Sequence, residues 1–125
     1  MQIYKTKGFA RFARRQSIDD ESLCEAIERA ERGLIDADLG VGVIKQRAPR
    51  AGQGRSGGFR TIVLYRTETR AVFVDGFAKS EHDNIDDDDL ERFRELAVEF
   101  LGYDSMQVTE LVEAGAWIEV ECDDS

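Results

Sequence analysis

The sequence predicts an α+β domain in which helices pack on a twisted, mostly antiparallel sheet. Three observations support this prediction. Apolar residues recur at helical spacing early in the chain, the period changes from 3.6 to 2 after Gly40, and a further helical pattern follows Asp86. At 125 residues the chain is expected to form one domain that buries a core of its own.

The N-terminal part is predicted to form one strand and two helices. Residues 2–5 are the strand, and residues 7–15 are a short helix with Phe9, Phe12 and Ala13 facing inward. The second helix, over residues 19–32, follows capping side chains at residues 17–20 and ends before Gly33, since glycine tolerates the left-handed conformation. Its apolar stripe comprises Leu23, Ala26, Ile27, Ala30 and Leu34.

The middle of the chain is predicted to be an antiparallel meander. After Gly40, one strand face carries Val41, Val43, Lys45 and Arg47, and the other carries Gly42, Ile44 and Gln46. Residues 49–58 hold the only proline and four glycines, so we expect a loop there. Strands over residues 59–66 and 70–79 follow, joined by a tight turn at residues 67–69.

The last third is predicted to contain two helices and a strand. Four aspartates at positions 86–89 open a third helix whose inner face is Leu90, Phe93, Ala97, Phe100 and Leu101. A calcium loop is the alternative for these aspartates, but the glycine and later glutamate of that motif are missing. Gly102 ends this helix, a fourth runs from Asp104 or Ser105 to Ala114, and residues 116–122 form a strand with Ile118 and Val120 inward.

Composition indicates a globular, cytoplasmic protein. The chain is 42% hydrophobic and has one proline, which argues against a disordered polypeptide. It has no apolar run of membrane-spanning length, and its N-terminus lacks the apolar core of a signal peptide. Cys24 and Cys122 are far apart and have no metal-ligand spacing, so we expect buried or unused thiols in a reducing cytosol.

Charge is divided unevenly along the chain. Residues 39–66 hold six Lys and Arg and no Asp or Glu, whereas residues 80–125 hold two basic and sixteen acidic side chains. A cationic segment inside a chain of net charge −9 predicts an anion-binding surface, and RNA is the leading candidate. The acidic third is expected to slow association with a polyanion through long-range repulsion.

Three segments carry a resemblance to a known family. They are KGFARFA at residues 7–13, GRSGGFR at 54–60 and VFVDGFAK at 72–79. Together with the order of the elements, they resemble the RelE/HigB-like toxins of bacterial type II toxin–antitoxin systems. The resemblance implies a RelE-like domain over residues 1–101, with residues 102–125 as an acidic extension packed on the same domain.

The resemblance also implies an activity, partners and a site. Active family members cut messenger RNA on the ribosome without a metal or organic cofactor, and they bind a cognate antitoxin that is often a helix-turn-helix DNA-binding protein. It implies that Arg60 contacts the scissile phosphate with Lys79 beside it, and that Lys45 and Arg47 face the same cleft.

Cleavage of RNA by its own 2′-hydroxyl requires a base, cations for the phosphorane charge and an acid for the leaving oxygen. Arg60, with Arg47 or Arg55, suits charge stabilisation because guanidinium holds two phosphate oxygens. Lys45 or Lys79 is the candidate base, with Lys45 favoured, and His82 is the candidate acid. Further RNA contacts are predicted for Arg50 and Arg55 in the loop and for a basic helix face of Arg11, Arg14 and Arg15.

Each assignment has a simpler alternative. Arg60 also fits a strand-edge residue with a solvated head group, Lys45 and Arg47 fit an ordinary sheet rim, and Lys79, His82 and the arginine face fit solvated surface. At the level of function, the alternatives are a catalytically silent member that only binds its antitoxin and a gyrase-targeting relative with the same fold. A separate hypothesis is that residues 102–125 cover the cationic cleft.

Overall fold

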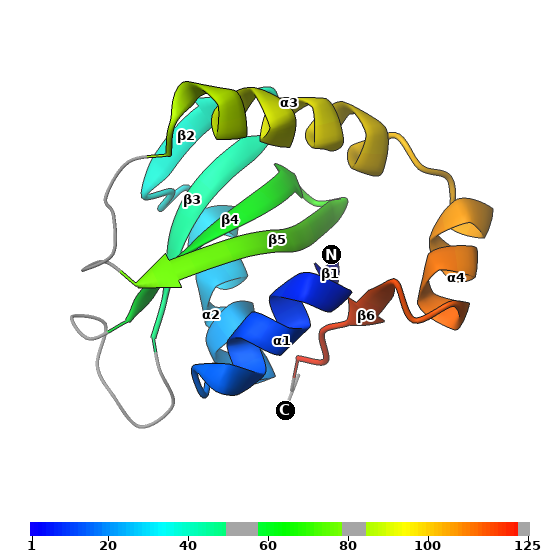
Figure 1. Ribbon diagram of the computed structural model, residues 1–125, viewed down its shortest axis with the longest axis horizontal. Helices are drawn as coiled ribbons and strands as arrows, with labels where there is room; N and C mark the ends of the chain where they lie inside the picture. Colours follow the sequence, from blue (N-terminus) through cyan, green and yellow to red (C-terminus); the bar gives the residue numbers. More distant parts are fainter. Residues whose placement is uncertain (50–57, 79–84, 123–125) are drawn as a thin grey trace.

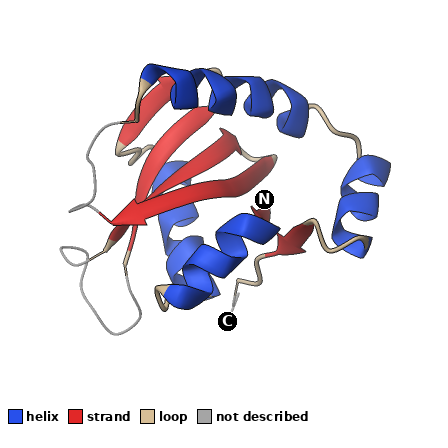
Figure 2. Ribbon diagram, viewed as in Figure 1, coloured by secondary structure: helices blue, strands red, loops and turns tan. Residues whose placement is uncertain are grey.

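The computed structural model describes residues 1–49, 58–78 and 85–122. Figure 1 labels the elements of this part of the chain, and Figure 2 colours them by type. Their order is β1 (Gln2–Thr6), α1 (Lys7–Arg15), α2 (Asp20–Glu31), β2 (Ala37–Gly40), β3 (Val43–Ala48), β4 (Phe59–Arg66), β5 (Arg70–Ala78), α3 (Asp87–Leu101), α4 (Ser105–Glu113) and β6 (Trp117–Glu119).

The strands form one mixed sheet in the order β2-β3-β4-β5-β1-β6. Neighbouring strands run antiparallel, except that β1 pairs with β5 in parallel. The predicted meander is β3, β4 and β5, and the N-terminal strand lies beside its last member. These features confirm the prediction of an α+β fold with a mostly antiparallel sheet.

Helices cover both faces of the sheet, and a hydrophobic core lies on each. We call them the α2 face, where Ile44, Val63 and Phe73 share a core with α1 and α2, and the α3 face, where Ile62, Leu64 and Val72 share a core with α3 and α4. In Figure 1, α3 lies across one side of the sheet and α1 and α2 lie on the other. No helix in the described residues is long and apolar enough to cross a membrane.

The helices begin where the sequence predicts. Thr6, Asp19, Asp86 and Asp104 are the N-caps, and each side chain accepts a hydrogen bond from a backbone N–H in the first turn. Such a cap stabilises a helix by about 0.5–2 kcal/mol relative to alanine. Capping therefore accounts for Asp86, and no group of three or more His, Cys, Asp or Glu in the described ranges is placed to hold a metal ion.

The sequence missed β2, the assignment of Val41 to a strand face was wrong, and so were the inward-facing assignments of Leu34 and Ile118. β2 pairs with β3 through a turn in which Gly40, Val41 and Gly42 all have positive φ, so Val41 is exposed instead of belonging to a strand face. Leu34 is 57% exposed because α2 ends before it, and Ile118 is 38% exposed, whereas Val120 is buried. A four-residue strand containing Asp and Gly gives no hydrophobic alternation to detect.

Gln46 fixes β2 and α2 to the sheet. Its side chain is fully buried, accepts from the Asp36 backbone N–H at 2.6 Å, and donates to the carbonyl oxygens of Ala26 at 2.9 Å and Leu34 at 3.3 Å. These bonds join β3 to a carbonyl inside α2 and to two residues of the segment between α2 and β2. A polar residue in the strand interior thus determines where the chain turns back.

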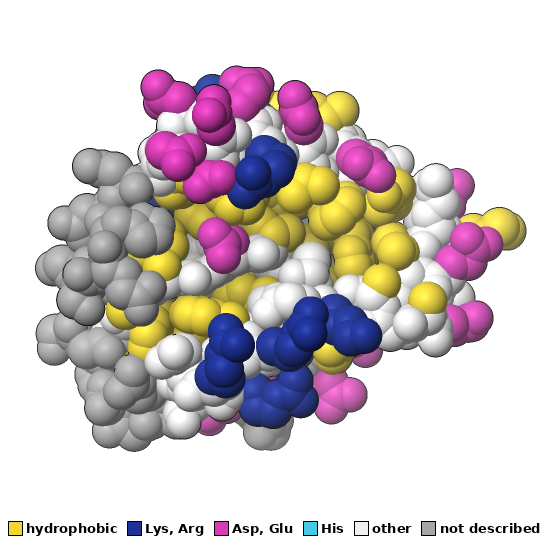
Figure 3. Space-filling model, in the orientation of Figure 1, with side chains coloured by type: hydrophobic (Ala, Val, Ile, Leu, Met, Phe, Trp, Pro, Cys, Tyr) yellow, Lys and Arg dark blue, Asp and Glu magenta, His cyan; other side chains and the backbone are white. Residues whose placement is uncertain are grey.

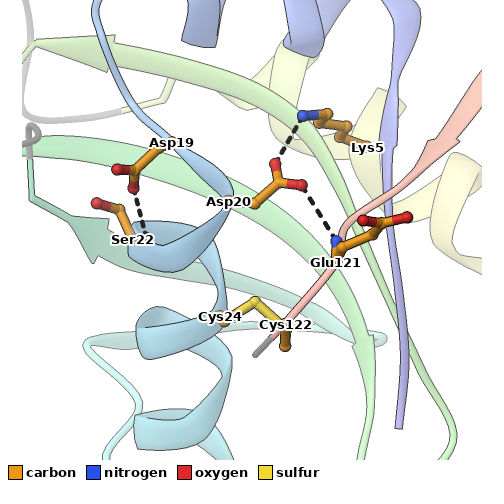
Figure 4. Close-up of a disulfide and its surroundings, with 7 residues drawn as sticks. All are labelled: Lys5, Asp19, Asp20, Ser22, Cys24, Glu121 and Cys122. Atoms are coloured by element: carbon orange, nitrogen blue, oxygen red, sulfur yellow. Dashed lines mark hydrogen bonds and ion pairs between the residues drawn. A yellow bond between two sulfur atoms is a disulfide. The ribbon is translucent and has the colours of Figure 1, made fainter. Parts of the chain in front are cut away.

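The two cysteines form a disulfide, so the prediction of unpaired thiols was wrong. Cys24 on α2 and Cys122 after β6 are 98 residues apart in sequence, but their Cα atoms are 5.8 Å apart. Figure 4 shows that Glu121 and Cys122 lie beside the start of α2, where Asp20 accepts from Lys5 Nζ at 2.8 Å and from the Glu121 backbone N–H at 3.1 Å. Tertiary structure, which sequence spacing does not reveal, brings the thiols together.

Candidate active site

Three cations predicted to form the site lie together on the α3 face. The register of β3 and β4 pairs Arg47 with Arg60 and Lys45 with Ile62, and Ile62 belongs to the core on that face. Side chains directly opposite each other in an antiparallel pair lie on the same face of the sheet. We call Lys45, Arg47 and Arg60 the cationic cluster, and all three are half-buried.

Arg47 and Arg60 are an unfavourable cross-strand pair. Like charges directly opposite each other destabilise a sheet. Arg66 and Arg70 form a similar pair at the far end of β4, but the buried Arg70 donates to the carbonyl oxygens of Phe100 at 2.9 Å and Tyr103 at 3.0 Å. Within residues 1–49, 58–78 and 85–122, the Arg60 guanidinium has no comparable acceptor. A phosphate between Arg47 and Arg60 would relieve their repulsion.

Asp36 positions Arg47. Its Oδ2 accepts from the Arg47 backbone N–H at 2.7 Å and lies 3.9 Å from Arg47 Nε. The same oxygen is 3.5 Å from an Arg29 guanidinium nitrogen, and Arg29, 5% exposed on α2, also donates to the Arg47 carbonyl oxygen. Sequence reasoning missed Asp36 because it precedes the acid-free segment and because β2 was not predicted.

A second carboxylate reaches the α3 face through a β-bulge. Val63 pairs with Phe73, but Ile62 pairs with Asp75, so Val74 is the extra residue of the bulge. In a regular register Ile62 would face Val74, and Asp75 would point to the α2 face. The bulge instead places Asp75 in one row with Ile62 and Lys45, and diagonally from Arg60.

Gly76 accommodates the bulge on the α2 face. A Cβ at Gly76 would lie 2.4 Å from Cε2 of Phe12, which projects from α1. Gly76 pairs with Thr61, and Phe77 pairs with Arg60 and is buried on the α3 face. The sequence Asp75-Gly76-Phe77 therefore sends a carboxylate and a ring toward the cationic cluster while leaving room for Phe12.

Comparison with known proteins identifies the family. The sequence model described as "RelE toxin of RelE / RelB toxin-antitoxin system" matches residues 1–120. The chain belongs to the RelE toxin family. A search of curated proteins found no match. The family confirms the resemblance stated from the sequence, and the HigB-like character of the two strand motifs stays a prediction.

Four predicted site residues of this RelE family member lie outside the described residues. They are Arg50, Arg55, Lys79 and His82, and their roles stay predictions. The described ends of the neighbouring strands are informative. Ala48 pairs with Phe59, which pairs with Ala78, and this row is adjacent to the row of Arg47 and Arg60. The cationic cluster therefore lies at the end of the sheet where β3 and β5 end and β4 begins.

The basic face of α1 is a separate surface. Arg11, Arg14 and Arg15 are exposed, as predicted from the helical period, but α1 packs on the α2 face, whereas the cationic cluster is on the α3 face. In Figure 3, basic side chains gather over α1, acidic side chains gather over α3, and hydrophobic surface lies between them. The structure therefore does not bring these three arginines together with Lys45, Arg47 and Arg60.

Proposed function

We propose that this RelE family protein is a ribosome-dependent mRNA endonuclease that inhibits translation in the cytoplasm as the toxin of a toxin–antitoxin pair. Its partners are the ribosome with its mRNA and a cognate antitoxin of the helix-turn-helix DNA-binding class. The reaction is attack of an RNA 2′-hydroxyl on the adjacent phosphate. It uses no metal ion or organic cofactor.

One observation carries this proposal: Arg47 and Arg60 face each other on adjacent strands with Lys45 next to them. Guanidinium groups bind phosphate oxygens in pairs, and a donor fixed before the reaction stabilises charge that develops in the transition state. Arg60 contacts the scissile phosphate, and Arg47, oriented by Asp36, contacts a second oxygen of the same group. Lys45 adds positive charge at the next row of the sheet.

The remaining predicted residues extend the site along the RNA. In the sequence, Lys79 and His82 follow β5, and Arg50 and Arg55 follow β3. We assign Lys79 to the phosphate, His82 to protonation of the leaving oxygen, and Arg50 and Arg55 to flanking phosphates. The face of Arg11, Arg14 and Arg15 contacts ribosomal RNA.

Expression in a bacterial host tests the proposal. The wild-type chain is induced without an antitoxin, and growth and the integrity of a translated reporter mRNA are followed. The expected result is growth arrest with mRNA cleavage, both abolished by Arg60→Ala. Arg66→Ala is the matched control, because Arg66 lies at the other end of the same strand and is exposed.

The other outcomes distinguish the alternatives. Normal growth with intact mRNA from a folded wild-type protein would refute nuclease activity and favour a member that acts only by binding its antitoxin. Growth arrest with DNA damage and intact mRNA would indicate a gyrase-targeting relative. Equal loss of toxicity in Arg60→Ala and Arg66→Ala would contradict the assignment of the active site to the sheet face that carries Arg47 and Arg60.

A further inference from the structure

We propose that Asp75 is the general base that takes the proton from the attacking 2′-hydroxyl. This inference rests on the proposed nuclease function and deepens it, since it assigns the catalytic base to the bulge of β5. Lys45, the candidate base from the sequence, then serves as a cation beside the reacting phosphate.

The bulge carries the inference. A bulge costs ladder hydrogen bonds, and such irregularities occur often beside active sites, where they redirect a side chain. In this sheet the extra residue, Val74, packs partly buried on the α3 face, and the shift in register moves Asp75 to the same face. Asp75 is exposed there, on the face of the sheet that holds the cationic cluster.

The position of Asp75 relative to the cationic cluster fits the reaction. It lies directly across from Ile62, and therefore diagonally from Arg60, and Ile62 in turn lies across from Lys45. Diagonal neighbours on one sheet face have Cα atoms about 7–8 Å apart, a gap that an arginine and an aspartate bridge through one phosphate and its neighbouring hydroxyl. Arg60 on the phosphate thus places the 2′-hydroxyl near Asp75.

A carboxylate is a side-chain type suited to accept this proton. An aspartate in its ordinary state is unprotonated at neutral pH, whereas lysine and arginine are protonated. A base must be within hydrogen-bond reach of the proton and must be able to accept it. Asp75 supplies a carboxylate on the same face of the sheet as the cationic cluster, so its chemistry fits the role of a base.

The step balances without a further reactant. An Asp75 carboxylate oxygen accepts the 2′-hydroxyl proton, the 2′-oxygen forms a bond to phosphorus, and the bond from phosphorus to the 5′-oxygen breaks. The 5′-oxygen takes a proton from an acid or from water, and Asp75 returns its proton to solvent. The products are a 2′,3′-cyclic phosphate and a 5′-hydroxyl, and no atom is oxidised or reduced.

Single-turnover cleavage on ribosomes programmed with a defined mRNA tests this role. Asp75→Asn should lower the maximal rate about 100-fold or more, within the range for loss of a general base. The concentration for half-maximal rate should not rise, because the substitution removes a negative charge beside a polyanion. Asp75→Glu should recover part of the rate, and Glu95→Gln, the same charge change on exposed α3, should have no effect.

The pH dependence adds a second readout. With an ionised carboxylate as base, the wild-type rate should change little between pH 6 and 8, values chosen above the ordinary aspartate pKa of about 3.9. The cleavage rate of Asp75→Asn should depend on hydroxide and should rise about tenfold per pH unit. A wild-type rate that already rises tenfold per unit would indicate a lysine or hydroxide base and overturn the inference.

The remaining outcomes separate the two proposals. Cleavage by Asp75→Asn within threefold of the wild type, or a change only in the half-maximal concentration, refutes Asp75 as base and leaves the nuclease function standing. Absence of cleavage by folded wild-type protein refutes the nuclease function and this inference with it. An mRNA with a 2′-deoxy nucleotide at the cleaved position must stay intact if the 2′-hydroxyl is the nucleophile.

Discussion

Replacement of Gly76 by alanine tests how closely Phe12 of α1 packs on β5 next to the bulge. The added Cβ would lie 2.4, 2.9 and 3.0 Å from three carbons of the Phe12 ring. Carbon atoms pack favourably at about 3.5–4.0 Å, so the ring must move by roughly 1 Å. Gly76→Ala is therefore expected to destabilise the protein.

The magnitude follows from the freedom of the Phe12 ring. The ring packs edge-on against Phe59, with centroids 5.7 Å apart, and against Phe9 at 5.8 Å, so little room is left on either side. Overpacking of this kind costs about 1–3 kcal/mol. Loss of glycine flexibility in the unfolded chain offsets about 0.4–1 kcal/mol of that. The net expectation is a loss of about 1–2 kcal/mol in unfolding free energy.

A double-mutant cycle by denaturant unfolding isolates the contact. Gly76→Ala is measured in the wild type and in Phe12→Ala, where the steric conflict is absent, so the substitution should be neutral or slightly stabilising there. Gly8→Ala is the control: Gly8 is on α1 with nothing within 4 Å of an added Cβ, and alanine should stabilise that helix by up to about 1 kcal/mol. Equal costs of Gly76→Ala in both backgrounds would refute the reasoning.

Two further predictions concern stability. Reduction of the disulfide, or Cys122→Ser, should lower the unfolding free energy by about 2–5 kcal/mol, because the bond closes a loop of roughly 100 residues. Guanidinium unfolding with and without reductant measures this loss. A transition that reductant does not change would contradict the prediction. Burial raises the pKa of the Tyr65 hydroxyl above its usual 10. The Glu31 carboxylate, which accepts from this hydroxyl at 2.9 Å, raises the pKa as well, whereas a hydrogen bond with Thr67 lowers it. The folded-state pKa lies above the unfolded one, so this stabilisation is complete below pH 10 and is lost as the pH rises further. Unfolding measured from pH 8 to 11 should show a shallower alkaline loss in Tyr65→Phe, and identical slopes would refute the assignment.

The sequence was sufficient for elements with a strong local pattern. Periodicity places the start of α1 and β4 correctly, and capping side chains do the same for α2, α3 and α4. β2 lacks such a pattern. Its backbone is held by pairing with β3 and, just before the strand, by a hydrogen bond to the buried Gln46. Elements whose stability comes from tertiary contacts are not visible to a search for periodicity.

The site was predicted in part for the same reason. Strand alternation put Lys45 and Arg47 on one face, and the structure adds Arg60 to that face through the register. Alternation alone assigns Asp75 to the wrong face, because nothing in the pattern from Arg70 to Ala78 marks Val74 as an extra residue. The one local sign was Gly76, since glycine inside a strand often accompanies a bulge or a close approach of another element.

The cationic segment contains no acidic residue, but in the folded protein acidic residues from other segments lie near its basic side chains. Residues 39–66 contain no acid, yet Asp36 contacts Arg47 from one side, and the bulge brings Asp75 to the other side of the same face. If the face only bound RNA, both carboxylates would weaken it, and their removal would tighten binding. Asp36 has a structural reason for its place, because it joins Arg29 to Arg47. Asp75 reaches the face only through an irregularity of the sheet, and this is the position that the proposed chemical role requires.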